Sequence, residues 1–148
     1  MTTLPDYVAA WRRLAVKERV GLGALAGSRG DEFAAALAAA SFAVPADATV
    51  SEREVNDRLL AWLAGPGAML STDHVELRRW LVDLGFVERD GYGRAYRRST
   101  LPPPAYRDAA AAIGSIDAGA VADQARQELA ELRAERRARH AAREGGRR

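Results

Sequence analysis

Hydrophobic residues recur at helical spacing near the start of the chain. The first stripe consists of Val8, Trp11, Leu14, Ala15, Leu22 and Leu25. Because positions three or four apart share one face of a helix, this stripe predicts a helix over residues 4–26, broken near Gly21 or Gly23. A second, shorter helix is predicted over residues 31–42, with Asp31 as its N-cap.

The clearest helix start lies at Ser51. Ser51 and Glu54 form the capping-box pattern, in which each side chain bonds the other residue's backbone N–H. The helix is predicted to end at Ala64, because the proline of Gly65-Pro66-Gly67 cannot continue it. Its apolar face consists of Val55, Leu59, Trp62 and Leu63.

A further helix and a hairpin follow this stop. Ser71 is the predicted N-cap of a helix that Gly85 ends. The apolar stripe of this helix consists of Leu77, Trp80, Leu81 and Leu84. Residues 86–98 then form two short runs around the glycine-rich stretch 90–93, which predicts a β-hairpin.

The last part of the chain is separated by a proline-rich linker over residues 101–104. Asp117 is a predicted cap, and residues 121–143 form a strongly helical stretch. The apolar stripe of this stretch consists of Val121, Ala125, Leu129 and Leu132, and it then gives way to arginines. We therefore expect a helix that is docked at its start and frayed at its end.

The order of these elements predicts the fold class. Helix, turn, helix and two-stranded hairpin is the order of a winged helix-turn-helix. The expected fold is mainly α, with a winged helix-turn-helix-like domain over residues 49–100 that carries a small two-stranded β-wing. A helical segment over residues 1–48 precedes it, and residues 101–148 supply the linker, a long C-terminal helix and a basic tail. The residues expected to be buried are Trp11, Phe33, Leu37, Phe42, Val55, Leu59, Trp62, Leu77, Trp80, Leu81 and Phe86.

Sequence motifs in this region resemble the DUF2087 family of bacterial domains. The motifs are Val50-Ser51-Glu52-Arg53-Glu54-Val55-Asn56, then Asp73 with Leu77-Arg78-Arg79 and Leu81-Val82-Asp83-Leu84-Gly85, then Arg89, Gly91 and Tyr96. The resemblance covers roughly residues 31–98, and Gly65-Pro66-Gly67 departs from the family pattern. Some family members are fused to ArsR-like helix-turn-helix domains and are labelled transcriptional regulators. The resemblance therefore implies a regulator-like module and supplies no catalytic residues.

Composition argues against several kinds of chemistry. The chain has no cysteine, which excludes disulfides, thiolate zinc sites and iron–sulfur clusters. His74 and His140 have no second ligand at metal spacing, and no serine stands in a catalytic-triad context. We therefore expect a noncatalytic protein without cofactor or metal. No apolar run approaches the roughly 20 residues of a membrane span, so we expect a cytoplasmic protein with no membrane contact.

Charge is nearly balanced, with 22 lysines and arginines against 20 acids and a net charge of +2. In the helix that would face DNA, Arg79 and Arg78 are the candidates to reach a guanine edge or a phosphate. The alternative is a surface network, in which Arg78 and either Asp73 or Asp83 tie this helix to its neighbours. The acids make the helix slightly negative, which is unfavourable beside phosphates.

The predicted wing is the more basic candidate. Arg94, Arg97 and Arg98 are interleaved with Tyr92 and Tyr96, a combination that suits phosphate or minor-groove contact. The alternative is an exposed hairpin whose charges keep an edge strand soluble.

Two further features have structural and functional interpretations. Asn56, the only asparagine, is expected to hydrogen-bond a neighbouring loop rather than a substrate. The C-terminal tail is either a nonspecific nucleic-acid arm or a solvated helix with a disordered end. Its arginines are Arg133, Arg136, Arg137, Arg139, Arg143, Arg147 and Arg148.

Two functions follow as hypotheses. The first is a noncatalytic DNA-binding or transcriptional-regulator module that contacts duplex DNA through Arg78, Arg79, Arg94, Arg97 and Arg98. The second is a protein-interaction or scaffold domain of the same fold that does not bind nucleic acid. A homodimer through the C-terminal helix is compatible with either function.

Overall fold

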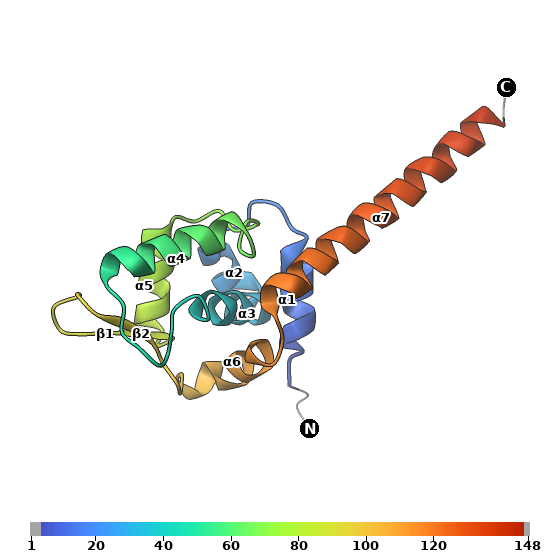
Figure 1. Ribbon diagram of the computed structural model, residues 1–148. Helices are drawn as coiled ribbons and strands as arrows, with labels where there is room; N and C mark the ends of the chain where they lie inside the picture. The colour runs from blue at the N-terminus through green and yellow to red at the C-terminus, as the bar shows by residue number, and fades with distance from the viewer. Residues whose placement is uncertain (1–3, 147–148) are drawn as a thin grey trace.

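The chain is arranged around one alanine-rich helix, α3. The computed structural model describes residues 4–146 and is mainly helical, with a small two-stranded antiparallel sheet (Figure 1). The elements are α1 (Tyr7–Ala15), α2 (Leu22–Ser28), α3 (Gly30–Ser41), α4 (Glu52–Ala64), α5 (His74–Asp83), β1 (Val87–Arg89), β2 (Tyr96–Arg98), the 3-10 helix η1 (Pro104–Tyr106), α6 (Arg107–Gly114) and α7 (Ala118–Gly145).

The central helix α3 is buried from Glu32 to Ser41. Alanine side chains are small, so α1, α2 and α6 can approach this helix closely on several sides. The prediction that Asp31 is the N-cap of this helix is wrong. Arg29 is both the C-cap of α2 and the N-cap of α3. Asp31 lies in the first turn instead and forms an ion pair with Arg13 at 2.8 Å.

The N-terminal helix breaks earlier than its glycines indicated. α1 ends at Ala15, and an irregular stretch precedes α2. Within that stretch the N–H of Val20 donates to the carbonyl of Met69, and the N–H of Ser71 donates to the carbonyl of Val20, both at 2.8 Å. A tertiary backbone pairing therefore replaces the helical hydrogen bonds, which local sequence did not reveal.

The same pairing shifts the start of α5. Asp73, not the predicted Ser71, is the N-cap, and its carboxylate accepts the N–H of Glu76 at 2.8 Å. Ser71 lies two residues before this cap, in the segment that pairs with Val20. The cap predicted for α4 is confirmed, since the hydroxyl of Ser51 accepts the N–H of the residue three positions on, at 3.2 Å.

The predicted hairpin is confirmed, with strands of three residues each. β1 and β2 pair antiparallel with Glu88 opposite Arg97. Val50 pairs with Tyr96 through two backbone hydrogen bonds of 2.9 and 2.8 Å. The backbone just before α4 therefore extends the hairpin by one short segment.

The first half of α7 is docked, as expected. The indole N–H of Trp11 donates to the carbonyl of Ala118 at 2.8 Å. Arg126 donates to the carbonyls of Ala15, Gly65 and Pro66 at 2.9, 3.3 and 3.1 Å. One guanidinium thus joins α7 to the end of α1 and to the turn after α4.

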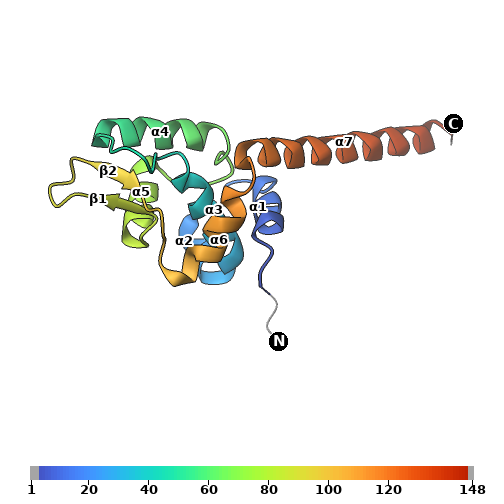
Figure 2. The same ribbon diagram turned by 60° about the horizontal axis from the view of Figure 1, so that its bottom comes forward.

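The second half of α7 extends away from the body (Figure 2). Every described residue from Ala130 onward is exposed. The predicted fraying is wrong, because the helix continues to Gly145. Arg147 and Arg148, predicted to belong to the basic tail, lie outside the described residues. Within residues 4–146, no helix combines the length and apolar content needed to cross a membrane.

Most of the predicted core is confirmed. The buried residues from that prediction are Trp11, Phe33, Leu37, Val55, Leu59, Trp62, Leu77, Leu81 and Phe86. Trp80 is half-buried, with its ring edge-on to Phe33. The prediction that Phe42 is buried is wrong, since this residue is 41% exposed. It directly follows the end of α3, and its ring lies at the surface against Arg98 and Gly114.

Candidate functional site

The candidate site is the surface formed by α5 and the β1–β2 hairpin, where all five predicted arginines originate. Three of these arginines have ionic or hydrogen-bonded partners within the protein. The five therefore differ in what they can offer to another molecule.

Arg78 is committed to the protein itself. Its guanidinium donates to the side-chain oxygen of Asn56, forms an ion pair with Glu52 at 3.1 Å, and lies 5.8 Å from the ring centre of Tyr96. Its side chain is only 17% exposed. Arg78 therefore fastens α5 to α4 and β2, and Asn56 bonds this neighbouring helix instead of a loop.

The sequence contained a signal for this contact that was not recognised. Glu52 and Asn56 are four residues apart, so they share one face of α4. A single long arginine on the next helix can reach both of them. The predicted alternative, in which Arg78 ties this helix to its neighbours, therefore holds for Arg78. Asp73 instead caps α5, and Asp83 forms no ion pair within residues 4–146.

The exposed side of α5 carries mostly acids. Its row of exposed residues, hereafter the α5 face, consists of Asp73, Glu76, Arg79 and Asp83. Because Arg78 is turned inward, three carboxylates stand beside the one guanidinium of Arg79. Within residues 4–146, the side chains of Glu76, Arg79 and Asp83 form no ion pair. The α5 face therefore has an excess of carboxylates. The Asp73 carboxylate is engaged as the N-cap of α5, and Arg19 lines a hollow together with Asp73 and Glu76.

The hairpin offers one free arginine among its predicted residues. Arg97 forms a cross-strand ion pair with Glu88 at 2.9 Å, and both side chains are about half exposed. Arg94 is exposed, with its guanidinium 6.0 Å from the ring centre of Tyr92. Tyr92 is itself 86% exposed, so the tip presents an aromatic ring and a cation together.

The hairpin turn is held by Asp90. Its carboxylate accepts the backbone N–H of Arg94 at 2.8 Å, and the turn uses the left-handed backbone of Gly93. Hydrogen bonding from the Arg94 N–H, joined by other backbone N–H groups of the turn, lowers the pKa of Asp90. The ionised carboxylate thus stabilises the turn that presents Arg94.

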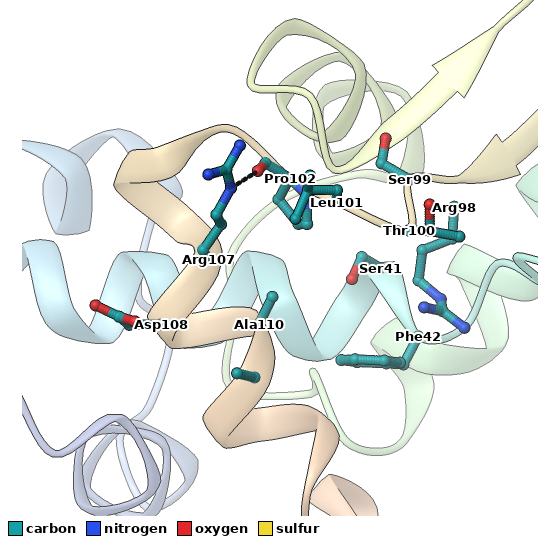
Figure 3. Close-up of a pocket in the computed structure, with 11 residues that line it drawn as sticks. Ser41, Phe42, Arg98, Ser99, Thr100, Leu101, Pro102, Arg107, Asp108 and Ala110 are labelled. Carbon is teal, nitrogen blue, oxygen red and sulfur yellow. Dashed lines mark hydrogen bonds between the residues drawn. The ribbon is translucent and has the colours of Figure 1, made fainter.

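Arg98 points away from the hairpin tip. Its Nε donates to the carbonyl of Val44 at 3.2 Å, and its guanidinium lies 4.5 Å from the ring centre of Phe42. Arg98 and Phe42 line a hollow of about 390 Å³ between the end of β2, the end of α3 and α6 (Figure 3). At the other end of this hollow, Arg107 donates to the carbonyl of Pro102 at 3.0 Å. The exposure of Phe42 and its contact with Arg98 could not be foreseen from local pattern.

The residues that carried the family resemblance meet in space. Asn56 and Arg78 are bonded, Tyr96 lies against Arg78, and Val55 and Leu81 are in the same core. Residues 29–98 match the DUF2087 family. The family is described as an uncharacterized protein conserved in bacteria. No curated protein matches the chain, and no solved structure matches it.

The DUF2087 match begins before the predicted domain boundary at residue 49. It includes α3, which packs against α1 and α6 outside the match. The core of the DUF2087 segment therefore continues into the flanking helices. The predicted division at residues 48 and 100 stays a prediction.

Neither histidine contributes to a metal site in the described structure. The Nε2 of His140 lies 3.2 Å from the carboxylate of Glu144 on the exposed surface of α7. Within residues 4–146, histidines, aspartates and glutamates do not gather in groups of three that could hold a metal.

Proposed function

We propose that the DUF2087 segment is a winged-helix-like domain, with α3, α4 and α5 as its three helices and the β1–β2 hairpin as its wing. The order of elements supports this assignment. The pairing of Val50 with Tyr96 supports it further, because it adds a short strand position between α3 and α4 on the free edge of β2. In this arrangement α5 is the helix that a DNA-binding relative would place in the major groove.

The domain acts as a noncatalytic protein-interaction module, and the α5 face is its binding surface. The observation that carries this function is the acidic character of that face once Arg78 is turned onto Glu52 and Asn56. Phosphates along DNA repel carboxylates, so Asp73, Glu76 and Asp83 disfavour the duplex. A basic protein surface would instead gain complementary charge and faster encounter.

DNA binding is a second candidate, and the exposed wing tip favours it. Arg94 and the neighbouring Tyr92 can contact a phosphate or the minor groove without using α5. This candidate agrees with the regulator-like module that the family resemblance implies. DNA binding in this form requires the attraction between the wing and the phosphates to exceed the repulsion between the phosphates and the carboxylates of the α5 face.

A paired binding assay tests the two functions on the full chain. Fluorescence anisotropy would follow a labelled oligoarginine peptide and a labelled random duplex across a salt series. We expect the peptide to bind, and Glu76→Gln with Asp83→Asn to weaken it by about fivefold for each carboxylate at low salt. Asp47→Asn, an exposed change elsewhere, is the matched control.

The duplex arm of the assay uses the variant Arg136→Glu/Arg143→Glu. This variant removes binding of the duplex to the arginines of α7, so that the remaining binding reports on α5 and the wing. We expect little duplex binding by this variant. Salt-dependent duplex binding that loses about one unit of slope on Arg94→Ala would favour the second candidate. Absence of peptide binding at low salt would overturn the proposed function.

A further inference from the structure

The second half of α7 has no contact that explains its position. Residues 130–146 are exposed on every side, and Figures 1 and 2 show them continuing straight out of the body. At 1.5 Å per residue this free half is about 25 Å long, which is roughly the width of a small domain. Leu132, the last large apolar residue of the docking stripe, is already 46% exposed.

One face of this free half is basic. Leu129, Arg136 and Arg143 follow at intervals of seven residues, so they lie on nearly the same side of the helix. The side of α7 that packs on the body in the first half of the helix therefore carries a row of guanidinium groups in the second half. Glu131 and Glu135 fall on other sides of the helix, whereas Glu144 lies beside Arg143 and contacts His140 at 3.2 Å. The row, hereafter the α7 row, consists of Arg133, Arg136 and Arg143, with Arg139 and His140 at its margins.

The α7 row cannot be satisfied within its own chain. α7 is one continuous helix that points away from the body, so its end cannot fold back onto α5. Pairing with the same half of another α7 would bring Arg136 and Arg143 against like charges. An acidic partner for the α7 row would therefore belong to another molecule.

An acidic row of the same spacing exists on the α5 face. Asp73, Glu76 and Asp83 are separated by three and then seven residues, and the three arginines of the α7 row repeat this spacing. Helices that lie side by side in the same direction would place each carboxylate opposite one guanidinium. In the same register Arg79 lies opposite Arg139, so one like-charged pair opposes the three attractive ones.

We infer that two copies of this chain associate, with the α7 row of each copy lying against the α5 face of the other. This inference rests on the proposed function of the α5 face and names its partner. A two-fold dimer makes the contact twice, which compensates for the small contribution of each exposed ion pair. The association is sensitive to salt, because it depends on exposed charges.

A charge-swap experiment on the full chain tests the inference. One variant carries Arg136→Glu and Arg143→Glu, and the other carries Glu76→Arg and Asp83→Arg. Within residues 4–146 these side chains form no ion pair, so both variants should keep the helical circular dichroism of the wild type. Sedimentation equilibrium at low salt should show a wild-type dimer and, for each variant alone, a dimer Kd raised at least about tenfold.

Mixing the two variants provides the decisive arm. Each α7 row then meets an α5 face of opposite charge, so both contacts are restored and a mixed dimer should form. Arg137→Glu, on a different side of α7, is the matched control and should leave the wild-type dimer intact.

Three results would overturn the inference. They are a wild-type monomer throughout the concentration range, a charge-reversed variant that dimerises like the wild type, and a mixture that stays monomeric. Duplex binding by a wild-type monomer that is lost on Arg136→Glu/Arg143→Glu would assign the α7 row to nucleic acid instead. The proposed function is judged separately, because peptide binding to Glu76 and Asp83 does not require α7.

Discussion

Two stretches of this chain are rich in alanine and lie in opposite environments. α3 is buried from Glu32 to Ser41, whereas residues 130–146 of α7 are exposed throughout. α3 has charged residues only in its first turn, while arginines and glutamates recur along the free half of α7. Alanine content predicts helix in both cases, and the spacing of charges decides which helix can enter a core.

The largest expected effect is that of a charge placed inside α3. Ala36 is fully buried, so Ala36→Glu should cost about 4 kcal/mol or more and leave little folded protein. Ala138→Glu, the matched change on the free half of α7, should alter stability by less than about 0.5 kcal/mol. Urea denaturation followed by circular dichroism would measure both. Similar losses for the two variants would contradict the assigned environments.

Removal of the Arg126 guanidinium, which joins α7 to the body, should have the next largest effect on the free energy of unfolding. Arg126→Ala leaves the carbonyls of Ala15, Gly65 and Pro66 without their donor, at an expected cost of about 1–3 kcal/mol. Arg133→Ala, seven residues further along the same helix, should be nearly neutral. Hydrogen exchange would show whether residues 118–129 lose protection. Unchanged protection there would mean that Trp11 and apolar contacts hold α7 alone.

The charged contacts of α3 and of the free half of α7 should also differ in how much they contribute to the free energy of unfolding. The carboxylate of Glu32 is 1% exposed and lies 2.7 Å from the ammonium of Lys17, so Lys17→Met should cost about 1–3 kcal/mol. Glu32→Gln added to that variant should recover part of the loss, because the buried carboxylate would otherwise have only the more distant Arg29, at 3.9 Å, to balance its charge. Glu144→Gln, which breaks the exposed contact with His140, should cost at most about 0.5 kcal/mol. Thermal denaturation of the wild type and the three variants would measure these differences.

The smallest effect is a local one at the hairpin turn. The folded pKa of Asp90 is lowered by the N–H of Arg94, so its stabilising effect is present above the unfolded value of 3.8 and is lost as pH falls through the folded pKa. NMR should show the Arg94 amide exchanging faster with solvent below pH 3.8 than acid catalysis alone explains. Asp90→Asn should remove this pH dependence. A pH dependence that persists in Asp90→Asn would assign it to another group.

Local sequence predicted those parts of the fold that depend on neighbouring residues. The start of α4 at Ser51, its end before Gly65, and the hairpin followed from capping and turn chemistry. The break after α1 and the late start of α5 did not, because Val20 pairs with a segment about fifty residues away.

The candidate site divides in the same way. The exposed arginines Arg79 and Arg94 could be placed from helical and hairpin periodicity. The inward turn of Arg78 could not, because it depends on how α4 crosses α5. That one contact with Glu52 and Asn56 changes the charge of the α5 face and with it the favoured partner.

Hydrogen–deuterium exchange of the full chain with an oligoarginine peptide, at a protein concentration below the dimer Kd so that the α5 face is uncovered, tests the central claim most directly. If the α5 face binds basic protein surfaces, protection should appear in α5, and Glu76→Gln with Asp83→Asn should abolish it. Duplex DNA at the same salt concentration should leave α5 unprotected. Protection of α5 and the hairpin by duplex DNA, with none from the peptide, would contradict the account.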